Sequence, residues 1–270
     1  MSTLCYSTAS YGSKYYNATN KLIESLNIIE NKKLPTIFVM TDKVDAIIKH
    51  PNVFVKDIID YNPKYSTYSD NYYRYNATAH RYNVLHALEN GYTNITYIDT
   101  DLLFLPNFDL DIVETFFEPN TVAGESMYGF KDYFTGAMLG KRFASYYKHF
   151  EGNENLDQFK DMVMPDDRLI YFSFRDINHG KEYVEWWGKC SDYREQADLC
   201  CAPVGNLDEN CFCAYKTGMK VEPSHTAYKY KMTVNDHVTH SDKYGTTGNY
   251  RLLHIQRRTG YAKARSLLSI

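Results

Sequence analysis

Two acids separated by one residue follow an apolar, β-prone run. Residues 95–98 lead directly into Asp99 and Asp101, and an apolar stretch resumes at 102–104. Because side chains alternate along a strand, both carboxylates would share a face if the extended backbone continued through them. Carboxylates gathered at the end of a buried strand are costly unless a cation lies between them. Hard divalent cations such as Mn²⁺ or Mg²⁺ prefer these oxygen ligands. The pattern predicts a divalent metal site, with a polar turn as the alternative.

Strand-like and helix-like patterns alternate around the acidic motif. β-prone runs occur at 3–8, 36–40, 53–55 and 95–98, and helical spacing occurs at 17–29 and 78–89. This order predicts βαβ units, and therefore an α/β fold whose central sheet is mainly parallel and flanked by helices. In such open sheets, ligands bind at the carboxyl ends of the strands. The two acids are expected at that edge.

The second half of the chain has weaker patterns. We expect further strands at 122–124, 137–140 and 250–255, helices at 157–164 and 167–174 on either side of Pro165, and an irregular segment at 192–219. Pro165, Asp166 and Asp167 precede an apolar run, which is typical of a helix N-terminus.

Length and charge limit the class of protein. The chain has 270 residues, which suits a single domain, and a formal net charge of -3 at pH 7. The weak negative charge argues against a nucleic-acid partner, which would need a basic face. There is no N-terminal signal, and no apolar run approaches the roughly 18 residues of a transmembrane helix. We therefore expect a cytoplasmic protein with no membrane span.

Most of the cysteines lie in one segment, namely Cys190, Cys200, Cys201, Cys211 and Cys213. Their spacing does not match a common zinc ribbon. In the cytosol we expect reduced, packed thiols, whereas an oxidising compartment would permit two disulfides.

Several short motifs occur in an order that is similar to a known family. They are the N-terminal strand, loop and helix, then the sequence from Tyr97 to Asp101, then 134–139, and finally 253–255. In this order the chain resembles the GT-A fold glycosyltransferases, and most closely the retaining, family-8-like group that uses nucleotide sugars. The resemblance covers most of residues 1–258. It implies a GT-A (Rossmann-like) fold in a single catalytic domain, 1–270, with a nucleotide-binding half at 1–104, an acceptor-side half at 105–258 and a basic tail at 259–270.

The resemblance also implies a reaction. A hexose would pass from a UDP-sugar to a hydroxyl of a glycan or protein acceptor, with retention of configuration. A Mn²⁺ or Mg²⁺ ion held by Asp99, Asp101 and His254 would stabilise the departing diphosphate. Near His254, Arg257 or Arg258 would neutralise the diphosphate as an anion clamp. In this the chain departs from the family, whose usual lysine-proline-tryptophan sequence after the histidine is absent here.

The resemblance implies two further groups of site residues. Those expected to contact the donor nucleotide are Thr8, Ser10, Tyr11, Asp42, Arg81, Asp99, Thr100 and Arg257. On the acceptor side, Asp166 and Asp167 are the candidate catalytic acids. In an inverting enzyme such an acid would deprotonate the acceptor hydroxyl, and in a retaining enzyme it would stabilise an oxocarbenium-like state.

Two other classes of function remain open. A sugar-phosphate nucleotidyltransferase shares the fold, but its glycine- and arginine-rich phosphate loop is not supplied by residues 9–13. A non-enzymatic carbohydrate-binding module could use some of the 26 tyrosines to stack sugars, with the acids binding a structural ion. Such a module would bind glycan without nucleotide.

Overall fold

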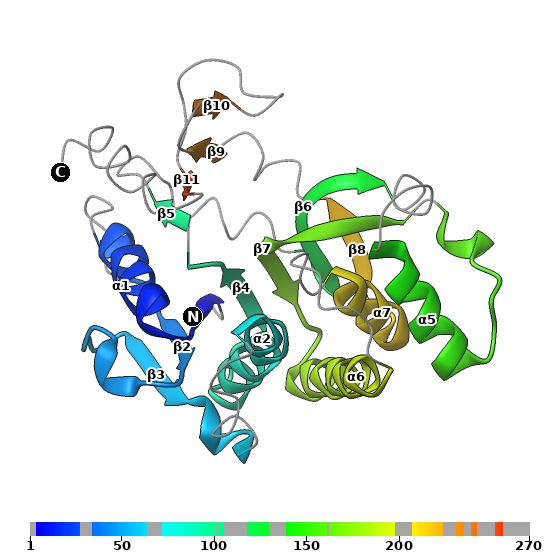
Figure 1. Cartoon of the computed structure of the whole chain (residues 1–270), viewed down its shortest axis with the longest axis horizontal. Helices are drawn as coiled ribbons and strands as arrows, with labels where there is room; N and C mark the ends of the chain where they lie inside the picture. The colour runs from blue at the N-terminus through cyan, green and yellow to red at the C-terminus, as the bar shows by residue number, and fades with distance from the viewer. Residues whose placement is uncertain are drawn as a thin grey trace.

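The computed structural model describes residues 4–27, 34–63, 72–100, 102–104, 118–129, 139–160, 162–197, 207–223, 231–234, 239–241 and 252–255. A seven-stranded sheet with the order β3-β2-β1-β4-β7-β6-β8 forms its centre (Figure 1). The strands are β1 (Leu4–Ser10), β2 (Ile37–Thr41), β3 (Val53–Asp57), β4 (Asn94–Ile98), β6 (Thr121–Gly129), β7 (Val163–Ser173) and β8 (Lys220–Pro223). All neighbouring pairs are parallel except those of β7, which is antiparallel to both β4 and β6. The expected α/β fold with a mainly parallel sheet is confirmed.

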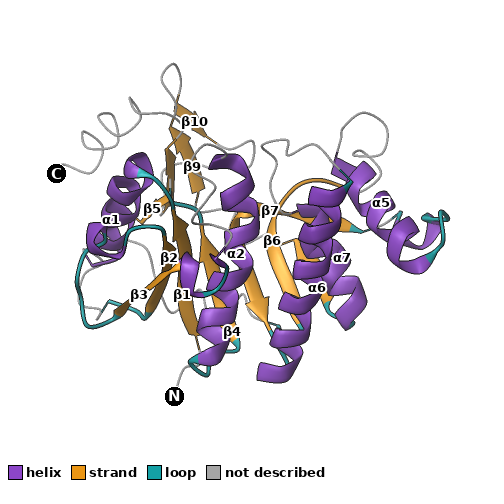
Figure 2. Ribbon diagram, turned by 60° about the horizontal axis from the view of Figure 1, so that its bottom comes forward, coloured by secondary structure: helices purple, strands orange, loops and turns teal. Residues whose placement is uncertain are grey.

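Helices cover both faces of this sheet (Figure 2). Helix α1 (Ser13–Asn27) packs on one face, and α2 (Tyr72–Glu89), α6 (Ile177–Gln196) and α7 (Leu207–Thr217) lie on the other, with α5 (Leu139–Glu151) beside α7. Three short 3-10 helices complete the described elements: η1 (Val44–Ala46), η2 (Ile58–Asp60) and η4 (Asp157–Phe159). None of the helices within the described ranges is long and apolar enough to span a membrane.

The central strands serve two apolar cores. Along β7, Ile170 and Phe172 belong to the core beneath α2, α6 and α7, whereas Leu169 and Tyr171 belong to the core beneath α1. Alternate side chains of a strand point to opposite faces, so a strand covered on both faces is apolar at every position.

A smaller, four-stranded sheet adjoins the end of β4. Its order is β10-β9-β11-β5, built from β5 (Leu102–Phe104), β9 (Lys231–Val234), β10 (Thr239–Ser241) and β11 (Leu252–Ile255). The C-terminal strand β11 pairs antiparallel with β5 and parallel with β9. Phe104 N donates a hydrogen bond of 3.0 Å to Ser25 Oγ, which joins β5 to α1. Through its pairing with β5, strand β11 lies next to the acidic motif.

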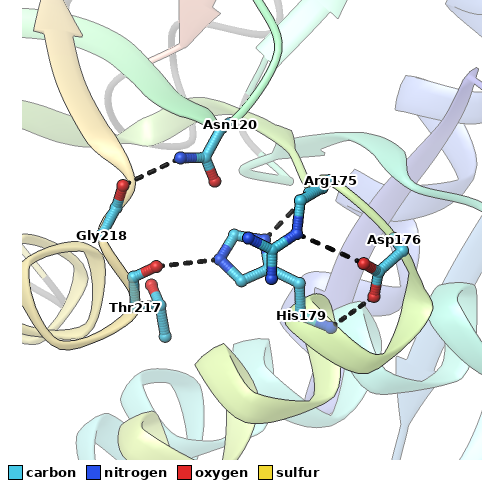
Figure 3. Close-up of polar contacts among 6 residues, drawn as sticks. All are labelled: Asn120, Arg175, Asp176, His179, Thr217 and Gly218. Atoms are coloured by element: carbon cyan, nitrogen blue, oxygen red, sulfur yellow. Dashed lines mark hydrogen bonds and ion pairs between the residues drawn. The ribbon is translucent and has the colours of Figure 1, made fainter.

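A network of hydrogen bonds joins α6, α7 and β6 at the amino ends of the parallel strands (Figure 3). His179 Nδ1 accepts from Arg175 N at 3.3 Å, and His179 Nε2 donates to Thr217 O at 3.0 Å. These two contacts select the neutral tautomer protonated on Nε2. Asn120 Nδ2 donates to Gly218 O at 2.8 Å and connects the turn after α7 to the start of β6.

Three expectations for the second half of the chain are wrong. Residues 163–173 form strand β7 with Pro165 inside it, where helices were expected at 157–164 and 167–174. Its continuous apolar run reflects burial on both faces, which periodicity alone does not distinguish from a buried helix. Residues 139–140 begin α5, although a strand was expected at 137–140. The segment 192–219, expected to be irregular, contains the end of α6 and all of α7.

Candidate functional site

Sheet topology brings most of the expected site residues to one edge. The parallel strands β1, β2 and β4 end at this carboxyl edge, so the loop after Ser10, Asp42 and Asp99 meet there. The antiparallel strand β7 begins at the same edge. Because Ile98, the last residue of β4, pairs with Leu169, residues 163–168 of β7 extend beyond the end of β4. Asp166 and Asp167 are within that extension, and their side chains lie outside the described part.

The first acid of the motif lies in a turn. Leu102 N donates to Asp99 O at 3.2 Å, and Thr100 N donates to Asp99 Oδ1 at 2.7 Å. The extended backbone, on which a shared face of the two acids depends, therefore ends before Asp99. Thr100 is buried, and its Oγ1 has no hydrogen-bond partner. Asp101 falls outside the described residues.

The C-terminal strand places the expected histidine beside the acidic motif. His254 of β11 pairs with Leu102 of β5, the residue that directly follows Asp101. The side chain of His254 and the whole of Arg257 lie outside the described part. At the level of backbone register, the three residues expected to bind the metal are thus adjacent. That they bind a metal stays a prediction.

The loop after β1 is tied to the end of β2. Asp42 Oδ1 accepts from Gly12 N at 3.2 Å and from Tyr16 Oη at 2.8 Å. Burial, together with the hydrogen bond to Asp42 and the charge of that acid, raises the pKa of Tyr16 to about 12. The phenol therefore stays a donor, and it fixes the carboxylate of Asp42 at the expected nucleotide side of the edge.

The other expected nucleotide contacts on β1 lie below the surface. Thr8, Ser10 and Tyr11 are 1%, 0% and 3% exposed. Thr8 Oγ1 and Ser10 Oγ are buried without a hydrogen-bond partner, while Asn83 Nδ2 donates to Thr8 O at 2.5 Å. Arg81 is also nearly buried, in the middle of α2, where its Nη2 donates to Tyr82 Oη at 2.6 Å. Donor contacts by these residues stay predictions.

Two buried acids at the start of α7 were not among the expected site residues. Helix α7 leads through a turn at Gly218 into β8, which is parallel to β6, so its first turn lies towards the carboxyl edge. Asp208 and Glu209 are both fully buried. Glu209 Oε1 accepts from Arg194 Nη1 at 2.5 Å and from Tyr146 Oη at 3.0 Å.

Asp208 differs from Glu209 in having no hydrogen-bond partner for either carboxylate oxygen. Burial raises its pKa well above the usual value, and the neighbouring Glu209 raises it further, against a smaller lowering by Arg142. The acids in the first turn of a helix are a recognised N-terminal signal that could have located this segment. From the sequence we instead expect an irregular segment at 192–219.

The cysteines that the structure describes are not part of a metal-binding group. Cys5, Cys190, Cys211 and Cys213 are buried free thiols. Within the described ranges, no group of three or more His, Cys, Asp or Glu side chains is placed to hold a metal ion. Cys200 and Cys201, like the side chains of Asp101 and His254, lie outside those ranges.

Comparison with known proteins identifies the fold. No protein-family model and no curated protein sequence matches the chain. Among the solved structures that match is the apo structure of WbbM, described as a bifunctional glycosyltransferase, with a TM-score of 0.52 and 15% identity. The match covers 93% of this chain but 45% of that one, so the chain spans less than half the length of WbbM. At this identity the likeness concerns the fold alone: the chain has the expected Rossmann-like α/β fold, shared with a glycosyltransferase.

Proposed function

We propose that the protein is a metal-dependent glycosyltransferase that moves a hexose from a UDP-sugar, with retention, to a hydroxyl of a glycan or protein. One observation carries this proposal. Strand β11 brings His254 to the position opposite Leu102, immediately after the two acids at the carboxyl edge. Two carboxylates and an imidazole are a donor set that suits Mn²⁺, and Mg²⁺ less well. The fold shared with WbbM, described as a glycosyltransferase, supports the same class.

Different residues along the carboxyl edge of the sheet would bind the metal ion, the base and the diphosphate. Asp99, Asp101 and His254 would hold the ion, which supplies Lewis-acid stabilisation of the leaving diphosphate when bound. Asp42, which accepts hydrogen bonds from Gly12 and Tyr16, would accept a further one from the base of the nucleotide. Arg257 would neutralise the diphosphate.

Acids from β7 and α7 would form the sugar and acceptor side. Asp166 and Asp167 extend beyond the end of β4 on the backbone of β7. Asp208, at the start of α7, adds a fully buried carboxyl group neither of whose oxygens has a hydrogen-bond partner.

UDP release by the purified protein tests the proposal directly. We expect slow, Mn²⁺-dependent hydrolysis of one sugar in a panel of UDP- and GDP-sugars, abolished by EDTA. Asp99→Asn, Asp101→Asn and His254→Gln should each lower the rate by about 10²-fold or more, as loss of a ligand or of transition-state charge stabilisation does. Asp157→Asn is the matched control, because Asp157 is exposed in η4, away from the site.

The outcomes separate the competing classes. Equal rates with Mn²⁺ and EDTA would refute metal dependence. If no nucleotide binds in the presence of Mn²⁺ while glycans do, the protein is a carbohydrate-binding module. Release of pyrophosphate rather than UDP would identify a nucleotidyltransferase.

A further inference from the structure

One arginine is buried between α2 and α6 without a counter-charge. Arg81 is 8% exposed. Its Nη2 donates to Tyr82 Oη at 2.6 Å, and its Cζ lies 4.6 Å from the centre of that ring. The Nε–H has no hydrogen-bond partner, and Arg81 forms no ion pair with any carboxylate of the described ranges. A buried charge is costly unless it is paired, so the pairing anion must come from elsewhere.

The other two arginines that are buried within the described ranges each interact with an acid on α7. Arg194 donates to Glu209 at 2.5 Å, and the charge of Arg142 lowers the pKa of Asp208 against the larger raising by burial. No such acid is paired with Arg81 within the described ranges.

Helix α6 leaves room for the guanidinium of Arg81. A Cβ at Gly188 would lie 2.8 Å from Nη1 and 3.7 Å from Cζ of Arg81. Glycine weakens a helix interior, so its presence here is explained by this close approach. Ser191, which lies three residues on and therefore beside Gly188 on the helix surface, is 1% exposed and its Oγ has no hydrogen-bond partner. Both orphaned groups belong to the same seam between the helices.

The position of Arg81 relates this seam to the carboxyl edge of the sheet. The neighbour of Arg81, His80, bonds at 2.6 Å to the hydroxyl of Tyr97, the next-to-last residue of β4. Helical side chains tilt towards the helix N-terminus, and α2 precedes a parallel strand, so the side chain of Arg81 tilts towards that edge. It lies against α6, the helix that follows β7, whereas Asp42 and its loop are on the far side of β1.

We propose that Arg81 binds an anionic group, phosphate or carboxylate, carried by the acceptor. The planar guanidinium matches either group through two parallel N–H···O bonds. This assignment differs from the donor contact that the family resemblance implies. Its first part, an anion site at Arg81, is independent of the reaction. Its second part, that the anion belongs to the acceptor, rests on the proposed function.

Thermal unfolding with and without anions, in the absence of metal and nucleotide, tests the anion site. With ~10 mM inorganic phosphate, methyl phosphate or glucuronate, the Tm of the wild-type protein should rise by roughly 2–4 °C. Stabilisation by glucuronate alone would assign a carboxylate, and stabilisation by the phosphates alone would assign a phosphate ester. Arg81→Met should unfold at a higher Tm than wild type without anion, because an unpaired buried charge is removed, and should not respond to any anion.

Two further variants keep the test decisive. Gly188→Ala retains the charge but displaces the guanidinium, so it should also lose the anion response. Arg175→Met removes an exposed arginine paired with Asp176 and should respond like the wild type. An anion response in Arg81→Met equal to that of the wild type would overturn the proposal.

Nucleotide binding separates this inference from the proposed function. Binding of UDP with Mn²⁺ should be unchanged in Arg81→Met. If that variant loses both the anion response and UDP binding, Arg81 holds the donor diphosphate and the acceptor assignment is wrong. If the wild type itself binds no nucleotide, the proposed function fails, and the assignment of the anion to the acceptor fails with it. The anion site would still be supported if Arg81→Met loses the anion response of the wild type.

Discussion

Acidic residues of the site differ in what surrounds them. Asp42 accepts two hydrogen bonds from the loop after β1, and Glu209 is fixed by Arg194 and Tyr146. Asp208 has neither a donor nor exposure to water. The first two are held in place as acceptors, whereas no hydrogen bond holds the carboxyl group of the third. The sequence shows where the acids are but not how they differ. The difference depends on which distant residues surround each carboxyl group in the fold.

Two histidines of α2 predict how stability depends on pH. Burial lowers the pKa of His80 from 6.5 to about 3, and burial, with the charge of Lys56, lowers that of His86 to about 4. As the pH falls below 6.5, the unfolded chain takes up protons that the folded chain does not, so stability is lost until the folded-state values are reached. The loss should approach about 1.4 kcal/mol per pH unit for each histidine.

Urea unfolding between pH 7 and pH 4.5 measures this dependence. His80→Gln should flatten the slope, since one titrating group is removed, although the lost contact to Tyr97 lowers stability at every pH. His149→Gln is the control, because His149 is exposed on α5 and its replacement should leave the slope unchanged. A slope that is the same in wild type and His80→Gln would contradict the prediction.

At the scale of elements, the first half of the fold is predictable from the sequence and the second half only partly so. Strands β1 to β4 and helices α1 and α2 follow from β-prone runs and helical spacing whose ends are well marked, although β1, β2 and β4 are buried on both faces. Strand β7 is apolar on both faces, and its pattern is equally that of a buried helix. The first two turns of α7 are buried on all sides. Asp208 and Glu209 therefore lie in the core, although charged residues in a helix normally indicate an exposed face.

The contact between α2 and α6 predicts the effect of a small substitution. A Cβ at Gly180 would overlap the side chain of Leu88. Replacing glycine by alanine in a helix interior normally stabilises by about 1 kcal/mol, but here overpacking should reverse the sign and cost roughly 1–3 kcal/mol. Chemical denaturation of Gly180→Ala provides the measurement.

A second substitution tests the cause of that loss. Leu88→Ala alone should destabilise by about 2–5 kcal/mol, since it opens a cavity. In the double variant the new methyl group has room, so the two losses should sum to more than the loss observed. If the two losses of stability simply add, the side chain of Leu88 is not what a methyl group at position 180 contacts.

At the scale of the whole molecule, the candidate metal site is assembled from distant parts of the chain. The acids follow β4, while His254 arrives on β11, the last described strand. From residue types and their order, the sequence indicated Asp99, Asp101 and His254 as one set of metal ligands. It did not indicate that β5 and β11 are paired, because a three-residue strand has too little pattern to specify its partner. The register, which places Leu102 opposite His254, is visible only in the fold.

Removing residues 252–270 tests this assembly. Among the described strands, β5 pairs only with β11, so the amides of Leu102 to Phe104 should lose their protection from hydrogen exchange. Amides of β1, β2 and β4 should stay protected, because their pairing lies wholly in the larger sheet. UDP release should be abolished. Activity at the wild-type level in the shortened protein would exclude His254 as a ligand.

The pairing of β5 with β11 also has a consequence for biosynthesis. A ribosome produces the chain from its N-terminus, so β1 to β4 and their helices can begin to fold while the last strand is still unmade. Strand β5 then lacks its partner until residues 252–255 have been made, across one of the longest separations between paired strands of the described fold. A chain whose translation stops before β11 would carry Asp99 and Asp101 without the strand that pairs with β5.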